Sequence, residues 1–347
     1  MTILAADERL REDNNFIKIN RTNYLYDVLT HAYGWCRTIF LDLLKAVFMS
    51  QAQYLSVFTD ATPQQRQDNF ADYWQFTQQH GGELFEADKD LAKKRACLQH
   101  FQNNPVRLRK PLANPEAFYR NYVTMVDDPK SLDKLTLMLC GIYKFARHEW
   151  VGIKGAWDVV PNMANSHTVE DKISRVHLAE EFCHVRLFDE MLKTCGLDQV
   201  EWVPLTPIKE KIYEFFPKVP GFLMDTPAFV TELMGVTFYC HLYKIFDELL
   251  ADEPEVRDRL KALLDEITID EVAHVGQRRN FIGSIGIKIS RYLVKPFYTL
   301  FFNDIPEVAE LFDVKQMIRD GENFDFNQLP QYMIERSWIP SYCKVAG

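Results

Sequence analysis

The chain has 347 residues, 47% of them apolar, and a net charge of −9 at neutral pH. The apolar content suffices for the core of one large domain or of a domain with a companion. The acidic balance argues against a nucleic-acid-binding surface, and seven cysteines without Cys-x-x-Cys spacing argue against a disulfide framework. The polar, acidic start (1–13) shows no secretory signal, and no apolar run is long enough to cross a membrane. We therefore expect a cytoplasmic globular protein.

The first part of the chain, residues 1–128, is expected to be a helical extension that packs on the rest. Asn20–Asp60 has the pattern of one or two aromatic-rich helices, and Thr62–His100 has a helical pattern broken at Gly81-Gly82. Residues 104–115 form a proline-punctuated linker with a basic cluster. A solvated loop is favoured there over a site for an anionic substrate or carrier.

A first long helix is predicted over Lys134–Ala156, with a start signal at Asp128-Pro129. Glu149 lies within its apolar stripe, where an unpaired carboxylate is costly. If the helical register differs by one residue, His148 is the inward-facing side chain instead.

A second long helix is predicted from Thr168, which with Asp171 resembles a capping box, to a stop at Gly196. After it, the prolines between positions 196 and 227 indicate a long crossover, not a tight turn. The third helix is predicted over Pro227–Leu250, with Pro227 in its first turn. The fourth starts near position 254 and frays at position 283 or 286.

The second helix carries Glu181-x-x-His184, preceded by Glu180. Residues three apart share a helix face, so the carboxylate and the imidazole point to one place. His177, four residues before Glu181, is on the same face. It is a candidate third nitrogen ligand, although a histidine that supports a ligand or is simply buried is favoured.

The third helix places Glu232 on an apolar face, and Tyr239 is seven residues further on. Tyr239 is close enough to serve as a radical or proton relay, but a packed aromatic is the simpler interpretation. The fourth helix repeats the motif as Glu271-x-x-His274, preceded by Asp270, 90 positions after the first pair.

The four helices thus give the chain order Glu, Glu-x-x-His, Glu, Glu-x-x-His. One pair alone carries little weight. Two pairs with two further glutamates on apolar faces are not typical of ordinary surface acids on amphipathic helices, which is the alternative interpretation. Gly152 and Gly235 each follow a glutamate of the pattern by three positions, and leave room for dioxygen or substrate, or else allow close helix packing.

The last part, residues 287–347, is expected to add C-terminal helices and a tail that cover the bundle. Ser284–Phe302 is apolar with three spaced basic residues. It would lie on a membrane surface or pack on the bundle with snorkelling basic side chains, and packing is favoured.

The pattern over about residues 129–286 resembles the ferritin-like di-iron carboxylate oxygenase and oxidase superfamily, which includes arylamine N-oxygenases and acyl-carrier-protein desaturases. The resemblance implies an all-α fold, a ferritin-like four-helix bundle with a long crossover after the second helix, plus additional helices. It also implies two iron ions, with the following roles for the site residues: Glu149 and His184 on one iron, Glu232 and His274 on the other, Glu181 and Glu271 bridging at the catalytic centre, Asp270 holding His184, and Glu180 holding His274.

The function expected from this resemblance is that of a non-haem di-iron oxygenase. It would oxidise a small organic substrate, free or carrier-bound, by hydroxylation, N-oxygenation, desaturation or oxidative cleavage. An external electron donor is expected, because the sequence has no glycine-rich nucleotide motif, and a homodimer is expected. The alternatives are a ligand-binding or radical-storing oxidase with Fe, Mn/Fe or two Mn ions, and a helical scaffold without enzymatic activity.

Overall fold

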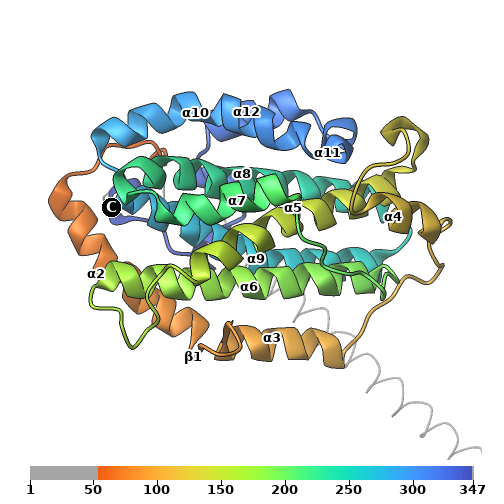
Figure 1. The fold of residues 1–347 in the computed structure, drawn as a ribbon, viewed down its shortest axis with the longest axis horizontal. Coiled ribbons are helices and arrows are strands. Elements are labelled where there is room, and N and C mark those ends of the chain that lie inside the picture. The colour runs from red at the N-terminus through yellow and green to blue at the C-terminus, as the bar shows by residue number, and fades with distance from the viewer. Residues whose placement is uncertain (1–53, 346–347) are drawn as a thin grey trace, which may run out of the picture. The chain divides into compact units, whose positions relative to one another are not determined.

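The computed structural model describes residues 54–345, so most of the predicted segment Asn20–Asp60 lies outside the described part. The described residues are mostly helical, as predicted (Figure 1). The α-helices are α2 (Pro63–Gly81), α3 (Ala92–Asn103), α4 (Pro115–Asn121), α5 (Lys134–Trp157), α6 (Val169–Thr194), α7 (Pro207–Phe215), α8 (Gly221–Leu249), α9 (Pro254–Phe281), α10 (Ser284–Asn303), α11 (Pro306–Leu311), α12 (Val314–Glu322) and α13 (Gln331–Arg336).

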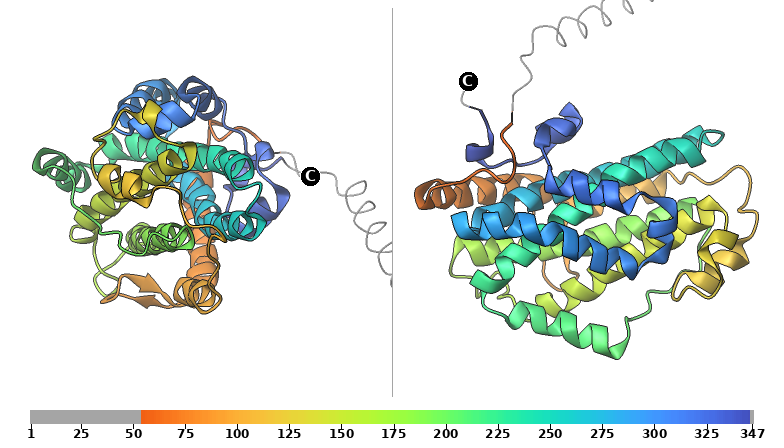
Figure 2. Two further views of the ribbon diagram at one scale, coloured as in Figure 1. Left: turned by 90° about the vertical axis from the view of Figure 1, so that its right-hand side faces the viewer. Right: turned by 90° about the horizontal axis from the view of Figure 1, so that it is seen from above.

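The long helices α5, α6, α8 and α9 form the centre of this part of the chain. Helix α5 packs on α6, α8 packs on α9, and α6 packs on α9 (Figures 1 and 2). Between α5 and α8, the rings of Phe145 and Phe238 stack with centroids 4.4 Å apart. Both side chains are almost fully buried, and burial of each phenylalanine contributes roughly 2 kcal/mol.

The ends of α6 follow from its sequence. Thr168 is the N-cap, and its hydroxyl accepts a hydrogen bond from the backbone N–H of Asp171. At the other end, Gly196 has a φ of +82°, a left-handed conformation that glycine adopts without strain. The N–H of Leu197 then reaches the carbonyl of Leu192 at 3.0 Å, which satisfies a terminal carbonyl of the helix. Both predicted boundaries are confirmed.

Two predicted boundaries were wrong. Helix α8 begins at Gly221, so Pro227 lies inside the helix and not in its first turn. It is tolerated because the hydrogen bond that it removes is close to the N-terminal end of a long helix. Asp128 caps the short 3₁₀ helix η1 (Pro129–Ser131), and the start of α5 is capped by Asp133.

Two shorter structures were not predicted. The break at Gly81-Gly82 is followed by an antiparallel hairpin of β1 (Leu84–Phe85) and β2 (Asp90–Leu91). The crossover between α6 and α8 contains α7 and the 3₁₀ helix η2 (Phe216–Lys218). Helix α7 packs on α5 but has no fully buried residue of its own.

Additional helices cover the four central ones on two sides. Helices α2 and α3 lie against α6, whereas α10 lies along α8 and packs on α11 and α12 (Figures 1 and 2). Two further 3₁₀ helices follow, η3 (Phe326–Gln328) and η4 (Ser341–Cys343). Among residues 54–345, no helix is long and apolar enough to cross a membrane.

Candidate metal centre

The residues singled out in the sequence converge inside the four central helices. Helix α6 supplies Glu180, Glu181, His184 and His177, α9 supplies Asp270, Glu271 and His274, α5 supplies Glu149, and α8 supplies Glu232. The three histidines and the two Glu-x-x-His glutamates are buried. Their clustering follows from the i, i+3 and i, i+4 spacing on α6 and α9, which pack against each other.

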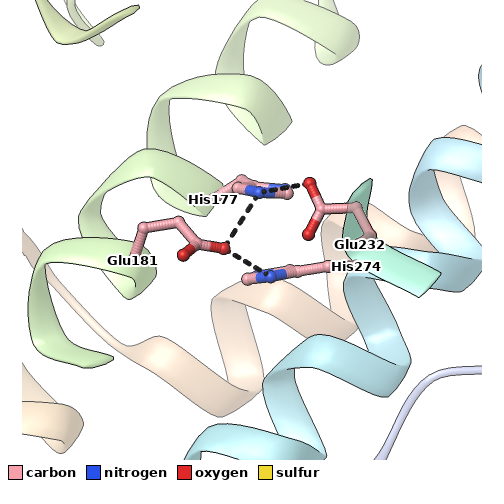
Figure 3. A group of neighbouring side chains, drawn as sticks. All are labelled: His177, Glu181, Glu232 and His274. Atoms are coloured by element: carbon pink, nitrogen blue, oxygen red, sulfur yellow. Dashed lines mark ion pairs between the residues drawn. The ribbon is translucent and has the colours of Figure 1, made fainter. Parts of the chain in front are cut away.

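One group consists of His177, Glu181, Glu232 and His274 (Figure 3). The Nε2 atom of His177 lies 3.3 Å from Oε1 of Glu181 and 3.3 Å from Oε1 of Glu232. The Nδ1 atom of His274 lies 3.0 Å from Oε1 of Glu181. The rings of His177 and His274 are stacked, with centroids 3.7 Å apart. The structure thus brings His177 into the site. The sequence alone left its role as a candidate ligand undecided.

The second group consists of Glu181, His184 and Glu271. The Nδ1 atom of His184 lies 3.2 Å from Oε1 of Glu271 and 3.5 Å from Oε2 of Glu181. Glu181 therefore belongs to both groups, with Oε1 in the first and Oε2 in the second. This is the position that a bridging carboxylate requires.

The outer nitrogen of each motif histidine is held by an acid from the opposite helix. The Nε2 atom of His184 hydrogen-bonds to Asp270 at 3.0 Å, and that of His274 hydrogen-bonds to Glu180 at 2.9 Å. These two contacts are the ones predicted. They leave each Nδ1 atom facing inward, and neither Nδ1 has a hydrogen-bond partner among the described residues.

Lys94 was not identified from the sequence. Its ammonium group lies 2.6 Å from Asp270, and both side chains are buried. Burial alone would raise the pKa of Asp270, but the charge of Lys94 and the hydrogen bond with His184 hold it well below its usual range. Lys94 lies on α3, in a polar stretch with no motif, so no sequence signal could have linked it to residue 270.

Glu149 faces the site from α5 and accepts a hydrogen bond from the Tyr239 hydroxyl at 2.6 Å. Its second oxygen, Oε2, is buried without a partner in the described part of the chain. The neighbouring His148 instead contacts the Tyr213 hydroxyl at 2.9 Å and Asp304 at 3.2 Å. Glu149 is therefore the residue directed at the other carboxylates.

The negative charges of the carboxylates repel one another. Burial and the charge of Glu181 raise the pKa of Glu271 to about 8, and the same causes raise the pKa of Glu149 well above its usual range. Burial would also raise the pKa of Glu181, but the neighbouring imidazoles of His177 and His184 hold it well below its usual range. Several buried acids that share one space are stabilised as anions only when positive charge lies among them.

A cavity of about 620 Å³ adjoins the four glutamates. Its walls are mainly apolar side chains of α5, α7, α8 and α10. Gly152 and Gly235 both lie on its lining, and a Cβ atom at Gly235 would stand 3.3 Å from Oε2 of Glu271. A larger residue at position 235 would therefore crowd the carboxylate.

The donor set fits a pair of divalent metal ions. Donors bound at roughly 2.0–2.2 Å from a first-row metal lie about 3 Å from each other, and the inward-facing nitrogen and oxygen atoms lie 3.0 to 3.5 Å apart. Carboxylate and imidazole ligands suit iron and manganese. The unpartnered Nδ1 atoms and Oε2 of Glu149 are the atoms that such ions would engage.

No family model, curated protein or solved structure is similar enough to the chain to count as a match. The function is accordingly inferred from the geometry of the site.

Proposed function

We propose that this protein is a non-haem di-iron oxygenase, built on a ferritin-like bundle of α5, α6, α8 and α9, that oxidises an apolar organic substrate with dioxygen. The observation that carries the proposal is the shared position of Glu181, whose two oxygens face two separate groups of donors. Two ions that share a carboxylate beside a largely apolar cavity, each with open positions, are the arrangement that activates dioxygen in such proteins.

The assignment of ligands differs in one respect from that expected by resemblance. His177 joins Glu181, Glu232 and His274 in the first group, so the two metal positions are unequal. The first has two imidazoles, and the second has His184 with Glu271 and Glu149. We propose that His177 is a metal ligand, because its Nε2 atom is equidistant from two carboxylates and its ring stacks on that of His274.

The bound irons would supply the capacity to reduce dioxygen and oxidise an unactivated substrate. The protein's own residues do the rest. Asp270 and Glu180 fix the orientation of the two motif imidazoles and increase their basicity. The Tyr239 hydroxyl donates to Glu149 and holds a proton next to the carboxylates. The apolar cavity binds the substrate and limits the access of water.

A second candidate is a radical-storing oxidase with Fe or mixed Mn/Fe ions. The observation that favours it is the 2.6 Å hydrogen bond between Tyr239 and Glu149, because a tyrosine next to a metal ligand can hold an oxidising equivalent. Tyr239 is completely buried, which protects such a species from solvent.

The metal content of protein expressed with iron tests the proposal. We expect about two irons per chain, and we expect Glu181→Ala to lose both, since Glu181 belongs to both groups. The matched control is Glu190→Gln, a buried acid on the same helix that pairs with Arg107 and should keep both irons. Two manganese ions would redirect the assignment to the second candidate. Folded protein that binds no stoichiometric metal would refute both.

A further inference from the structure

Exposed apolar side chains gather on the elements that flank the cavity. Ten of the fifteen large apolar side chains that are exposed in the described part of the chain lie between positions 208 and 300. They occur on α7, η2, the first turn of α8, and α10. The most exposed include Ile208, Phe215, Phe222, Ile285, Tyr292 and Leu300, with Phe222 at 80% and Tyr292 at 83%.

Helix α10 has two apolar sides. One side, with Ile287, Val294 and Tyr298, is buried in the core, on the side where Tyr298 hydrogen-bonds to Thr237 of α8. The other presents Ile285, Tyr292 and Leu300 to solvent. Packing on the bundle explains the first set but not the second. The predicted packing of this helix on the bundle is confirmed by the first set.

The basic residues of α10 are also exposed to solvent. Lys288, Arg291 and Lys295 are all exposed, and the helix has no acidic residue. This is a local positive surface in a chain whose net charge is −9. Apolar side chains interspersed with lysine and arginine are the composition of helices that lie in the headgroup region of a membrane.

These surfaces surround the open side of the cavity. Helix α7 and η2 line it with Ile212 and Phe216, and α10 lines it with Phe297 and Leu300. Helix α10 packs along α8, and α7 packs on α5. At one end, Gly286 of α10 stands next to Thr226 of α8, so the start of α10 lies near the exposed first turn of α8.

Two kinds of partner would cover such a surface, and the charges decide between them. The face carries six basic residues and three acids, Glu210, Glu214 and Asp225. A second copy that binds through the same face by two-fold symmetry therefore brings two net positive surfaces together, and this arrangement is repulsive. A bilayer with anionic headgroups attracts each exposed lysine or arginine. Exposed apolar side chains gathered on one face in this way are typical of an interaction site.

We propose that the face formed by α7, η2, the start of α8 and α10 docks on an anionic lipid bilayer, with the cavity opening towards the lipid. The protein lies on the membrane and does not span it. We infer further that the substrate is an amphiphile whose apolar chain enters the cavity from the bilayer. This second half of the inference rests on the oxygenase function proposed above.

Sedimentation of the full chain with vesicles tests the docking. The vesicles contain equal parts of phosphatidylglycerol and phosphatidylcholine, and phosphatidylcholine alone serves for comparison. We expect binding to the anionic vesicles that weakens as salt is added. The double variant Phe215→Ser/Phe222→Ser should bind about tenfold more weakly or worse. Lys288→Gln/Lys295→Gln should lose about fivefold per lysine. The control Val126→Ser, an exposed valine outside this face, should bind normally.

Circular dichroism and metal content of the same preparations show that the variants are folded and keep the centre intact. Wild-type protein that ignores anionic vesicles overturns the docking proposal, and so does binding that the phenylalanine variant leaves unchanged. A protein that dimerises through this face, with dimerisation lost in the phenylalanine variant and no vesicle binding, also overturns it. If metal is bound but vesicles are not, docking fails and the oxygenase proposal stands. If the protein binds vesicles but no metal, the docking proposal stands and the oxygenase proposal fails.

Discussion

The buried pair between Lys94 and Asp270 gives a sharp test of how the centre is supported. We consider Lys94→Met, which keeps the length and apolar stem of the side chain but removes its charge. Only 5% of the Lys94 side chain and 1% of the Asp270 side chain are exposed, so solvent cannot replace the lost partner. Breaking a buried ion pair by removing one partner costs about 3–5 kcal/mol.

The cost should fall near the lower end of that range. Asp270 retains the hydrogen bond with His184 at 3.0 Å and a contact with His80 at 3.5 Å. We therefore expect Lys94→Met to lower the free energy of unfolding by about 3 kcal/mol. For a domain with about 5–15 kcal/mol of stability this is a large fraction. Urea unfolding with a chelator present, followed by circular dichroism, measures it without a contribution from bound metal.

The control is a lysine in a comparable pair near the surface. Lys193 lies 2.7 Å from Asp189, but 36% and 25% of the two side chains are exposed. Lys193→Met should cost less than about 1 kcal/mol. The double variant Lys94→Met/Asp270→Asn should cost less than the sum of its two single changes, because no buried charge is left alone. Equal, small effects of Lys94→Met and Lys193→Met would refute the reasoning.

Three other outcomes are expected. Glu180→Gln keeps the size of the side chain but weakens its hold on His274, and should lower metal affinity by roughly 10- to 100-fold in a competition titration; unchanged affinity would contradict the supporting role. Tyr239→Phe removes the hydrogen bond to Glu149. In a radical-storing oxidase it should abolish the paramagnetic tyrosyl signal formed with dioxygen, whereas an oxygenase should keep turning over substrate. Removal of bound metal by a chelator should lower Tm by about 5–10 °C, and an unchanged Tm would argue against a site that belongs to the folded state.

The sequence located the candidate site well because its residues lie on long, strongly periodic helices. On α6 and α9, Glu181, His184, Glu271 and His274 share faces by helical spacing alone, and the structure brings them together. The prediction that Glu149 and not His148 faces inward also agrees with the contacts. Whether these residues bind metal remains a prediction.

The features that were missed depend on tertiary packing. Lys94 is sequentially distant from Asp270, and nothing in its polar neighbourhood indicates that it is buried. Helix α7 and the first turn of α8 lie in the segment whose prolines predict a long crossover, and the prolines do not indicate the helices within it. Pro227 in particular suggested a helix start, although the backbone continues regularly before it. The position of the cavity between α7 and α10 depended on these same segments and was not predictable.

The crossed hydrogen bonds between α6 and α9 have a consequence for assembly. Each helix carries one Glu-x-x-His histidine and the acid that orients the corresponding histidine of the other helix: Glu180 holds His274, and Asp270 holds His184. A slip of either helix by a single residue turns both partners away at once, so the two bonds fix the relative register of the pair. The histidine of one helix is therefore not oriented for metal binding until the other helix has packed against it. We therefore expect high-affinity metal uptake to appear in refolding only when α6 and α9 have associated, as one all-or-none step.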